Sequence, residues 1–185
     1  MARFPARAAV PPSLGEALCA LGIALRPAAR GDMPFLRDLF GGFRALEMAL
    51  VPWSAEQKRA LLDDQFRLQH THFLRYFPRT DFWIVTQGNA APAPAPIGRL
   101  YLDRSSPEWR IIDIGLMPPA RAAGVGSALI EWVQRSAREA GAAEIALDVA
   151  HSNPLARRLY LRLGFVEDGV ATATHQPMRW RVPIS

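Results

Sequence analysis

The fold of this chain is decided by one stretch of its sequence, Arg121-Ala122-Ala123-Gly124-Val125-Gly126-Ser127. Residues 110–117 precede it as a mostly apolar run that ends at Pro118-Pro119, which is typical of a buried strand. Residues 127–140 follow it with apolar side chains at helical spacing, which predicts an amphipathic helix. The stretch is therefore a glycine-containing turn between a strand and the start of a helix.

This turn has the properties of an anion-binding site. The first backbone N–H groups of a helix have no partner within the helix, and the helix dipole adds positive potential at this end. Gly124 and Gly126 have no Cβ, so a phosphate group can approach the backbone closely. Arg121 adds a fixed positive charge beside the turn. The pattern therefore predicts a ligand that carries a pyrophosphate.

Two common phosphate-binding motifs do not fit the turn. A P-loop requires Gly-Lys-Ser/Thr, which does not follow here. The dinucleotide-binding fingerprint would need a third glycine at the position of Leu129, and no clean strand–helix–strand unit surrounds the turn. Both of these readings of the glycines are therefore excluded.

The segment downstream narrows the choice. Residues 144–149 predict another strand, and Asn153-Pro154, Leu159-Tyr160 and Leu163-Gly164-Phe165 follow it. In this order and spacing, the Arg-x-x-Gly-x-Gly turn and the downstream segment resemble the two cofactor-binding segments of the GCN5-related N-acetyltransferase (GNAT) superfamily. The resemblance is strongest over residues 97–165, and it includes features of a bacterial subgroup whose members mostly lack assigned substrates.

The resemblance implies that acetyl-CoA is the cosubstrate. It places the pantetheine arm against the backbone of Leu116 and Met117 and against the side chain of Asn153. Asn153 is equally suited to capping the helix that would begin at Pro154. The pyrophosphate would lie on the loop formed by Arg121, Ala122, Ala123, Gly124, Val125, Gly126 and Ser127.

Two positions of this loop depart from the family pattern. Ala122 stands where members of the family usually have glycine, and Ala123 stands where many have a basic residue. Alanine still offers its N–H but restricts the backbone, and one phosphate-facing charge is absent. We expect cofactor binding to be retained but weakened.

Tyr160 is the main candidate for a catalytic acid. It follows Asn153 at the distance where the resemblance implies a phenol near the sulfur of coenzyme A. A phenol of pKa about 10 can protonate a thiolate whose conjugate acid has a pKa of about 8.5. The alternative is a tyrosine that only packs within its helix face.

A base is needed because a primary amine of pKa about 10.4 is mostly protonated at neutral pH. Asp113 is flanked by isoleucines on a strand, where burial would make its carboxylate a stronger base. Asp148 aligns with a carboxylate that serves as the base in some members of the family. Ordered water is the third possibility, and the sequence leaves the choice open.

The oxyanion that forms during transfer needs a hydrogen-bond donor, which a backbone N–H at a bend of the strand can supply. Gly115 lies inside the predicted strand, where glycine often marks a bulge or a close approach of backbone. We therefore consider the backbone of Leu116 and Met117 as the donor. The alternative is a glycine that only permits core packing.

The remaining pattern predicts one α/β domain with a mixed, mostly antiparallel twisted sheet and flanking helices. The expected element order is β-α-α-β-β-β-α-β-α-β-β over residues 23–185. Asp32 is a plausible cap for the first helix, Gly41-Gly42 is expected to interrupt it, and Ser54 with Gln57 forms a capping-box pattern. Residues 90–96 alternate alanine and proline, which favours an extended conformation.

Composition limits the other classes of function. The formal net charge is +5, but the basic residues are scattered and accompany no nucleic-acid motif, so we expect no nucleic-acid partner. No apolar run approaches the roughly 20 residues needed to span a bilayer, so we expect no membrane association. Cys19 is the only cysteine, which excludes an internal disulfide. Residues 1–22 are expected to form a poorly ordered or loosely packed extension of a cytoplasmic protein.

Acceptor specificity in this family comes from the helices after the first strand and from the final hairpin. Glu47 could attract a cationic amine, although a solvated surface glutamate is more common. His70 and His72 have no third ligand at a convincing spacing, so we expect no metal. The aromatic residues of these helices are core by default and include Phe43, Trp53, Phe66, Phe73 and Tyr76.

The sequence therefore predicts an acetyl-CoA-dependent N-acetyltransferase that acts by direct transfer to a small-molecule or peptide amine in a ternary complex. No covalent nucleophile stands in a motif, which argues against a ping-pong route. The main alternative is a non-catalytic acyl-CoA-binding module with the same fold. The sequence leaves the acceptor, the acyl-chain preference and homodimerisation open.

Overall fold

The computed structural model describes residues 4–5, 11–88 and 94–183. Seven strands form one sheet in the order β1-β2-β3-β4-β5-β7-β6. The strands are β1 (Ile23–Pro27), β2 (Asp81–Gln87), β3 (Ala95–Asp103), β4 (Glu108–Leu116), β5 (Glu144–Ala150), β6 (Val166–Glu167) and β7 (His175–Arg181). The helices are α1 (Gly15–Ala20), α2 (Met33–Ala49), α3 (Ala55–Tyr76), α4 (Val125–Glu139) and α5 (Pro154–Arg162).

In this sheet, β4 and β5 pair in parallel and the other neighbouring strands pair antiparallel. The predicted fold class and element order are confirmed, with α1 added before β1. None of the helices in the described ranges is long and apolar enough to cross a membrane.

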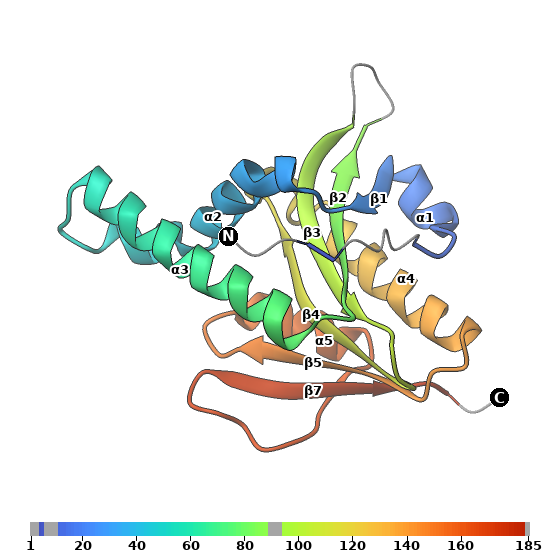
Figure 1. Ribbon diagram of the computed structural model, residues 1–185. Coiled ribbons are helices and arrows are strands. Elements are labelled where there is room, and N and C mark those ends of the chain that lie inside the picture. The colour runs from blue at the N-terminus through green and yellow to red at the C-terminus, as the bar shows by residue number, and fades with distance from the viewer. Residues whose placement is uncertain (1–3, 6–10, 89–93, 184–185) are drawn as a thin grey trace.

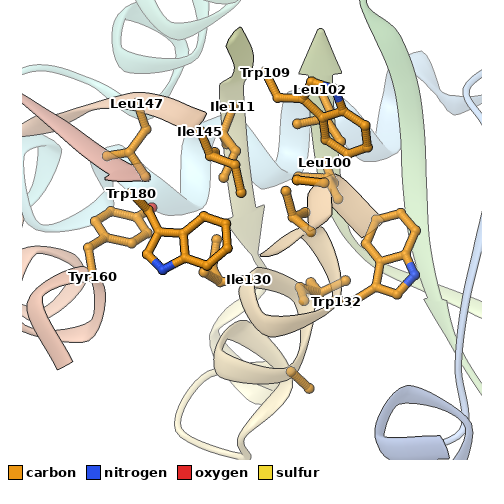
Figure 2. Close-up of a cluster of buried hydrophobic side chains, with 14 of the residues drawn as sticks. Leu100, Leu102, Trp109, Ile111, Ile130, Trp132, Ile145, Leu147, Tyr160 and Trp180 are labelled. Carbon is orange, nitrogen blue, oxygen red and sulfur yellow. The ribbon is translucent and has the colours of Figure 1, made fainter. Parts of the chain in front are cut away.

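The helices cover the two faces of the sheet unequally (Figure 1). A large apolar core joins α1, α4 and α5 to one face, and Figure 2 shows side chains of β3, β4, β5 and β7 gathered around Ile130 and Trp132 of α4. A smaller core joins α2 and α3 to the other face through Leu36, Phe40, Phe66 and Ile84. We call the first the α4 face and the second the α3 face.

Helix α4 forms because its apolar residues recur at helical spacing. Leu129, Ile130 and Val133 are fully buried, as the periodicity predicted, and so is Trp132. The indole N–H of Trp132 donates to the carbonyl of Ser13 at 2.9 Å, which satisfies its polar atom within the core. The helix thereby ties the N-terminal segment to the sheet.

The expectation of a loose N-terminal extension does not hold for residues 11–22. Helix α1 contacts α4 and β1, and Leu18 is fully buried in the large core. A single leucine in a short helix gives no amphipathic period, so the sequence carried no signal for this packing. Residues 1–3 and 6–10 lie outside the described part.

Three local expectations have mixed outcomes. Helix α2 runs unbroken through Gly41-Gly42, because burial of the neighbouring Leu39 and Phe40 outweighs a glycine cost of about 1 kcal/mol per residue. Asp32 does not cap α2 through its side chain, which instead accepts from the Ala29 N–H and pairs with Arg26. The capping box of Ser54 and Gln57 is confirmed.

The alanine–proline segment is only partly visible. Residues 89–93 lie outside the described part, and Ala95 and Pro96 begin β3. The extended conformation expected for residues 94–96 is therefore found as the start of a strand, and the rest of that expectation stays untested.

Replacing Leu18 with alanine should lower the free energy of unfolding by about 2–5 kcal/mol, because it removes a fully buried side chain from the core. The exposed neighbour Cys19 gives a matched control, and Cys19→Ala should change stability by less than about 0.5 kcal/mol. Urea unfolding of the three proteins measures both effects. Equal effects of the two substitutions would show that α1 does not belong to the core.

Candidate active site

The candidate site lies where β4 and β5 stop pairing. Their ladder has three pairs, which end at Arg110↔Ala146, although β4 continues to Leu116 and β5 to Ala150. Figure 1 shows the two strands diverging from this point. We call the region between residues 111–116 and 147–150 the β4–β5 opening.

The opening exposes backbone groups of β4. The Met117 N–H donates to the Ile97 carbonyl at 2.8 Å, so this residue directs its hydrogen bonds toward β3. In an antiparallel ladder the backbone N–H and C=O groups of successive residues point alternately to the two neighbouring strands. The backbone groups of Ile114 and Leu116 therefore point toward β5, where the β4–β5 ladder has already ended. The Leu116 N–H and the backbone of Ile114 therefore face the opening, and the role predicted for Leu116 stays a prediction. The Met117 N–H is engaged by β3, so the expectation that it is a free donor is wrong.

The bend of β4 occurs earlier than the glycine suggested. Tyr101 pairs with Asp113 and Leu102 pairs with Ile111, so Ile112 is the extra residue of a β-bulge. Gly115 instead permits a close approach, because a Cβ built there would lie 2.2 Å from Cζ of Phe43. The packing alternative for Gly115 therefore holds, and the predicted bend at this residue is wrong.

The predicted phosphate loop has a left-handed backbone at two positions. Gly124 has φ 80° and precedes the first turn of α4, and no side chain caps its N–H groups. Ala122 has φ 61°, a conformation that costs a non-glycine residue about 1–2 kcal/mol. This explains why glycine would suit position 122 better than alanine. A Cβ added at Gly124 would meet no atom within 4 Å, so the space above the loop is open.

Two arginines bring positive charge to the loop from different elements. The Arg121 Nε donates to the Leu116 carbonyl at 2.9 Å, and its guanidinium carbon lies 5.6 Å from the centre of the Phe43 ring. Arg162 of α5 reaches Ser127 at the start of α4, with 3.3 Å between Nη2 and Oγ. The sequence gave no sign that Arg162, which lies in the next helix along the chain, adjoins this loop.

Tyr160 lies on α5 in the large core, close to Leu147 and Trp180 (Figure 2). Burial raises the pKa of its phenol far above the usual value near 10, and the Asp113 carboxylate raises this pKa further. The structure therefore brings the predicted acid and one predicted base within electrostatic reach of each other. The phenol stays protonated at neutral pH and can donate a proton.

Asp113 is ion-paired instead of isolated among isoleucines. Its partner is Arg99 on β3, whose side chain is only 2% exposed and also donates to Gln69 of α3 at 3.0 Å. The Arg99 guanidinium carbon lies 5.3 Å from the ring centre of Tyr101. Asp113 thus belongs to a buried polar cluster on the α3 face, which the neighbouring isoleucines did not indicate.

Asp148 lies on the same face but near solvent. It is ion-paired with Arg110 of β4, and the two side chains are 41% and 39% exposed. Of the two predicted bases, Asp113 is the one whose charge acts on Tyr160. Asn153 accepts from the Ala156 N–H at 3.1 Å, which confirms its role as a helix cap and leaves its role toward a ligand a prediction.

The predicted acceptor-side residues separate into two groups. Phe66 and His70 are buried in the α3 face, whereas Phe43, Trp53 and Tyr76 are exposed to solvent. A shallow groove of about 500 Å³ runs along α3 and is lined by Arg67, Leu68, Gln69, Thr71, His72, Arg75 and Tyr76. Among the described residues, no group of three or more His, Cys, Asp or Glu side chains is arranged to hold a metal ion.

Comparison with known proteins identifies this arrangement. Residues 44–165 match the acetyltransferase (GNAT) family. The fold is similar to that of PaiA N-acetyltransferase from Thermoplasma acidophilum in complex with coenzyme A, with a TM-score of 0.62, 15% identity, and coverage of 86% of this chain and 98% of that one.

Two further solved structures have the same fold. An acetyltransferase from Thermus thermophilus gives a TM-score of 0.63 at 18% identity, with coverage of 87% of this chain and 97% of that one. Spermidine N-acetyltransferase from Vibrio cholerae, in complex with CoA and spermine, gives a TM-score of 0.57 at 20% identity. The match covers 86% of this chain and 95% of that one. These identities support a common fold and do not transfer an acceptor.

Ala122→Gly should raise the free energy of unfolding by roughly 0.5–1 kcal/mol, because relief of the left-handed alanine exceeds the added entropy of the unfolded chain. The matched control is Ala123→Gly, which should lower stability by about 0.4–1 kcal/mol because this alanine has no positive φ to relieve. Urea unfolding measures both. Equal losses in the two variants would contradict the strain at position 122.

The raised pKa of Tyr160 predicts a loss of stability in alkali. The contribution of Tyr160 to stability is fully present below pH about 10, which is the pKa of a tyrosine phenol in the unfolded chain. It declines above this pH because the phenol then loses its proton in the unfolded chain but keeps it in the folded one. Above pH 10 the free energy of unfolding should therefore fall less steeply with pH in Tyr160→Phe than in the wild type. The two slopes should differ by up to about 1.4 kcal/mol per pH unit. Urea unfolding between pH 9 and 11 gives the slopes, and identical slopes would refute the assignment.

Proposed function

The chain belongs to the acetyltransferase (GNAT) family, and on this premise we propose that it transfers the acetyl group of acetyl-CoA to a primary amine by direct attack in a ternary complex. The observation that carries the proposal is the β4–β5 opening, which has the uncapped start of α4 at one end, with Tyr160 buried near Leu147 and under the electrostatic influence of Asp113. A cosubstrate with an anionic head and an amide-containing arm fits this combination.

The loop and the strand supply different parts of the binding site. The N–H groups at the start of α4, together with Arg121 and Arg162, would hold the pyrophosphate. The backbone of Ile114 and Leu116 would pair with the amides of the pantetheine arm as an added strand does at a sheet edge. The open space at Gly124 supports this fit, because no atom of the described residues lies within 4 Å of a Cβ built there.

The chemistry needs an acid for the leaving thiolate and a base for the amine. The Tyr160 phenol is protonated and buried next to the opening, so it is our candidate acid. Asp113, Asp148 or an ordered water would take the proton of the amine. No covalent enzyme intermediate is needed, because the nitrogen attacks the thioester directly.

One observation favours the alternative of a non-catalytic acyl-CoA-binding module. Both candidate carboxylates, Asp113 and Asp148, are held in ion pairs with arginines. A module that only binds the cosubstrate would need neither of them. Turnover distinguishes the two functions.

Calorimetric titration of acetyl-CoA tests the binding site. We expect micromolar binding by the wild type and a loss of at least about tenfold in Gly124→Asp, because its carboxylate would face the phosphates. Gly124→Asn is the matched control, since asparagine has the same size and tolerates a positive φ similarly but carries no charge. A folded wild type that binds no acetyl-CoA would overturn the proposal.

Release of free coenzyme A in the presence of a panel of amines tests transfer. Tyr160→Phe should reduce kcat by about 100-fold or more while acetyl-CoA still binds, because the ring remains and only the proton donor is lost. Binding without turnover of any amine would favour the non-catalytic module.

A further inference from the structure

The exposed ion pair between Arg110 and Asp148 points to the class of acceptor, and this inference rests on the proposed function. We propose that the acceptor is a free α-amino acid, whose carboxylate binds Arg110 and whose amino group binds Asp148.

The pair lies at the closed end of the β4–β5 opening, where the two strands begin to separate. Arg110 belongs to the last pair of the ladder, opposite Ala146, and Asp148 lies two residues further along β5. Because strand residues two apart point to the same face, Ala146 and Asp148 both point to the α3 face, as Arg110 does. The side chains of Arg110 and Asp148 are each about two-fifths exposed, so a ligand can reach both.

Three other carboxylates of β4 and β5 on this face are also held by arginines. Glu108 and Glu144 both pair with Arg179 of β7, with 3.2 Å between Arg179 and Glu108. Asp113 pairs with the buried Arg99. A zwitterion can exchange with an existing pair and leave the charge balance unchanged.

An α-amino acid carries both groups that this exchange requires. Its carboxylate can accept two parallel hydrogen bonds from the Arg110 guanidinium, and its ammonium group can donate to Asp148. The exchange releases Asp148 from Arg110 and turns it toward the amine. A simple amine or a peptide N-terminus has no adjacent carboxylate, so Arg110 would stay on Asp148.

The released carboxylate completes the proton balance. Asp148 takes the first proton from the ammonium group, and the nitrogen lone pair then forms the N–C bond to the acetyl carbon. The C–S bond breaks as the tetrahedral intermediate collapses. The thiolate takes a proton from Tyr160, which regains one from the acylated nitrogen, and Asp148 releases its own proton to water. The products are the N-acetyl amino acid, free coenzyme A and one proton.

The test compares each amino acid with its own carboxamide, which keeps the amine and the side chain but removes the negative charge. With saturating acetyl-CoA and the full chain, we expect kcat/KM for the best amino acid to exceed that of its carboxamide by at least about tenfold. In Arg110→Gln this preference should disappear through a rise in KM for the acid, while kcat/KM for the carboxamide should not fall, because Asp148 is then free of its arginine. Calorimetry with acetyl-CoA checks that the variant is folded.

Arg179→Gln is the matched control, because it removes an arginine on the same face that lies across Ala146 from Arg110 and pairs with Glu108 and Glu144 instead of Asp148, so it should keep the preference. Equal kcat/KM for acids and carboxamides in the wild type would overturn the inference while the transferase stands. Acetyl-CoA binding without turnover of any acid would overturn it as well. Failure to bind acetyl-CoA would instead defeat the proposed function itself.

Discussion

The rest of the structure depends on the point where β4 and β5 stop sharing hydrogen bonds. Backbone groups inside a sheet must find partners, so two strands that separate expose a strip of backbone that something else has to satisfy. Here the ladder ends after three pairs, and the bulge at Ile112 bends β4 away from its neighbour. The helix that joins the two strands, α4, begins beside the gap, and α5 places Tyr160 against it. One interruption of a sheet thus creates the binding strip and positions the groups around it.

Charge around the gap is organised in matched pairs. Asp113 and Asp148 each face an arginine from a neighbouring strand, in one case buried and in the other half exposed. Arginine suits this arrangement because its planar fork binds carboxylates with defined geometry and keeps its charge at any relevant pH. What remains uncompensated by any side-chain cap is the positive end of α4. The electrostatics therefore favour an anionic head group at the loop and a balanced ligand at the sheet.

The sequence predicted most of the fold because its signals are local. The turn at residues 121–127, the capping box at Ser54 and the apolar period of α4 each depend on residues close in the chain. The failures concern contacts between distant segments. The burial of Leu18, the ion pair of Asp113 and the approach of Arg162 to Ser127 arise from tertiary packing, which leaves no periodic pattern. The bulge at Ile112 was missed for the same reason, since only the register with β3 reveals it.

The contact between Phe43 and Gly115 has a consequence for how such a protein can diverge. The ring of Phe43, on α2, occupies the volume that a side chain at position 115 would need. The same ring lies beside the guanidinium of Arg121. A larger residue can enter position 115 only if the ring at position 43 gives way to something smaller. These two positions, far apart in the chain, should therefore covary among descendants, and a change at either would alter the packing beside the arginine that adjoins the phosphate loop.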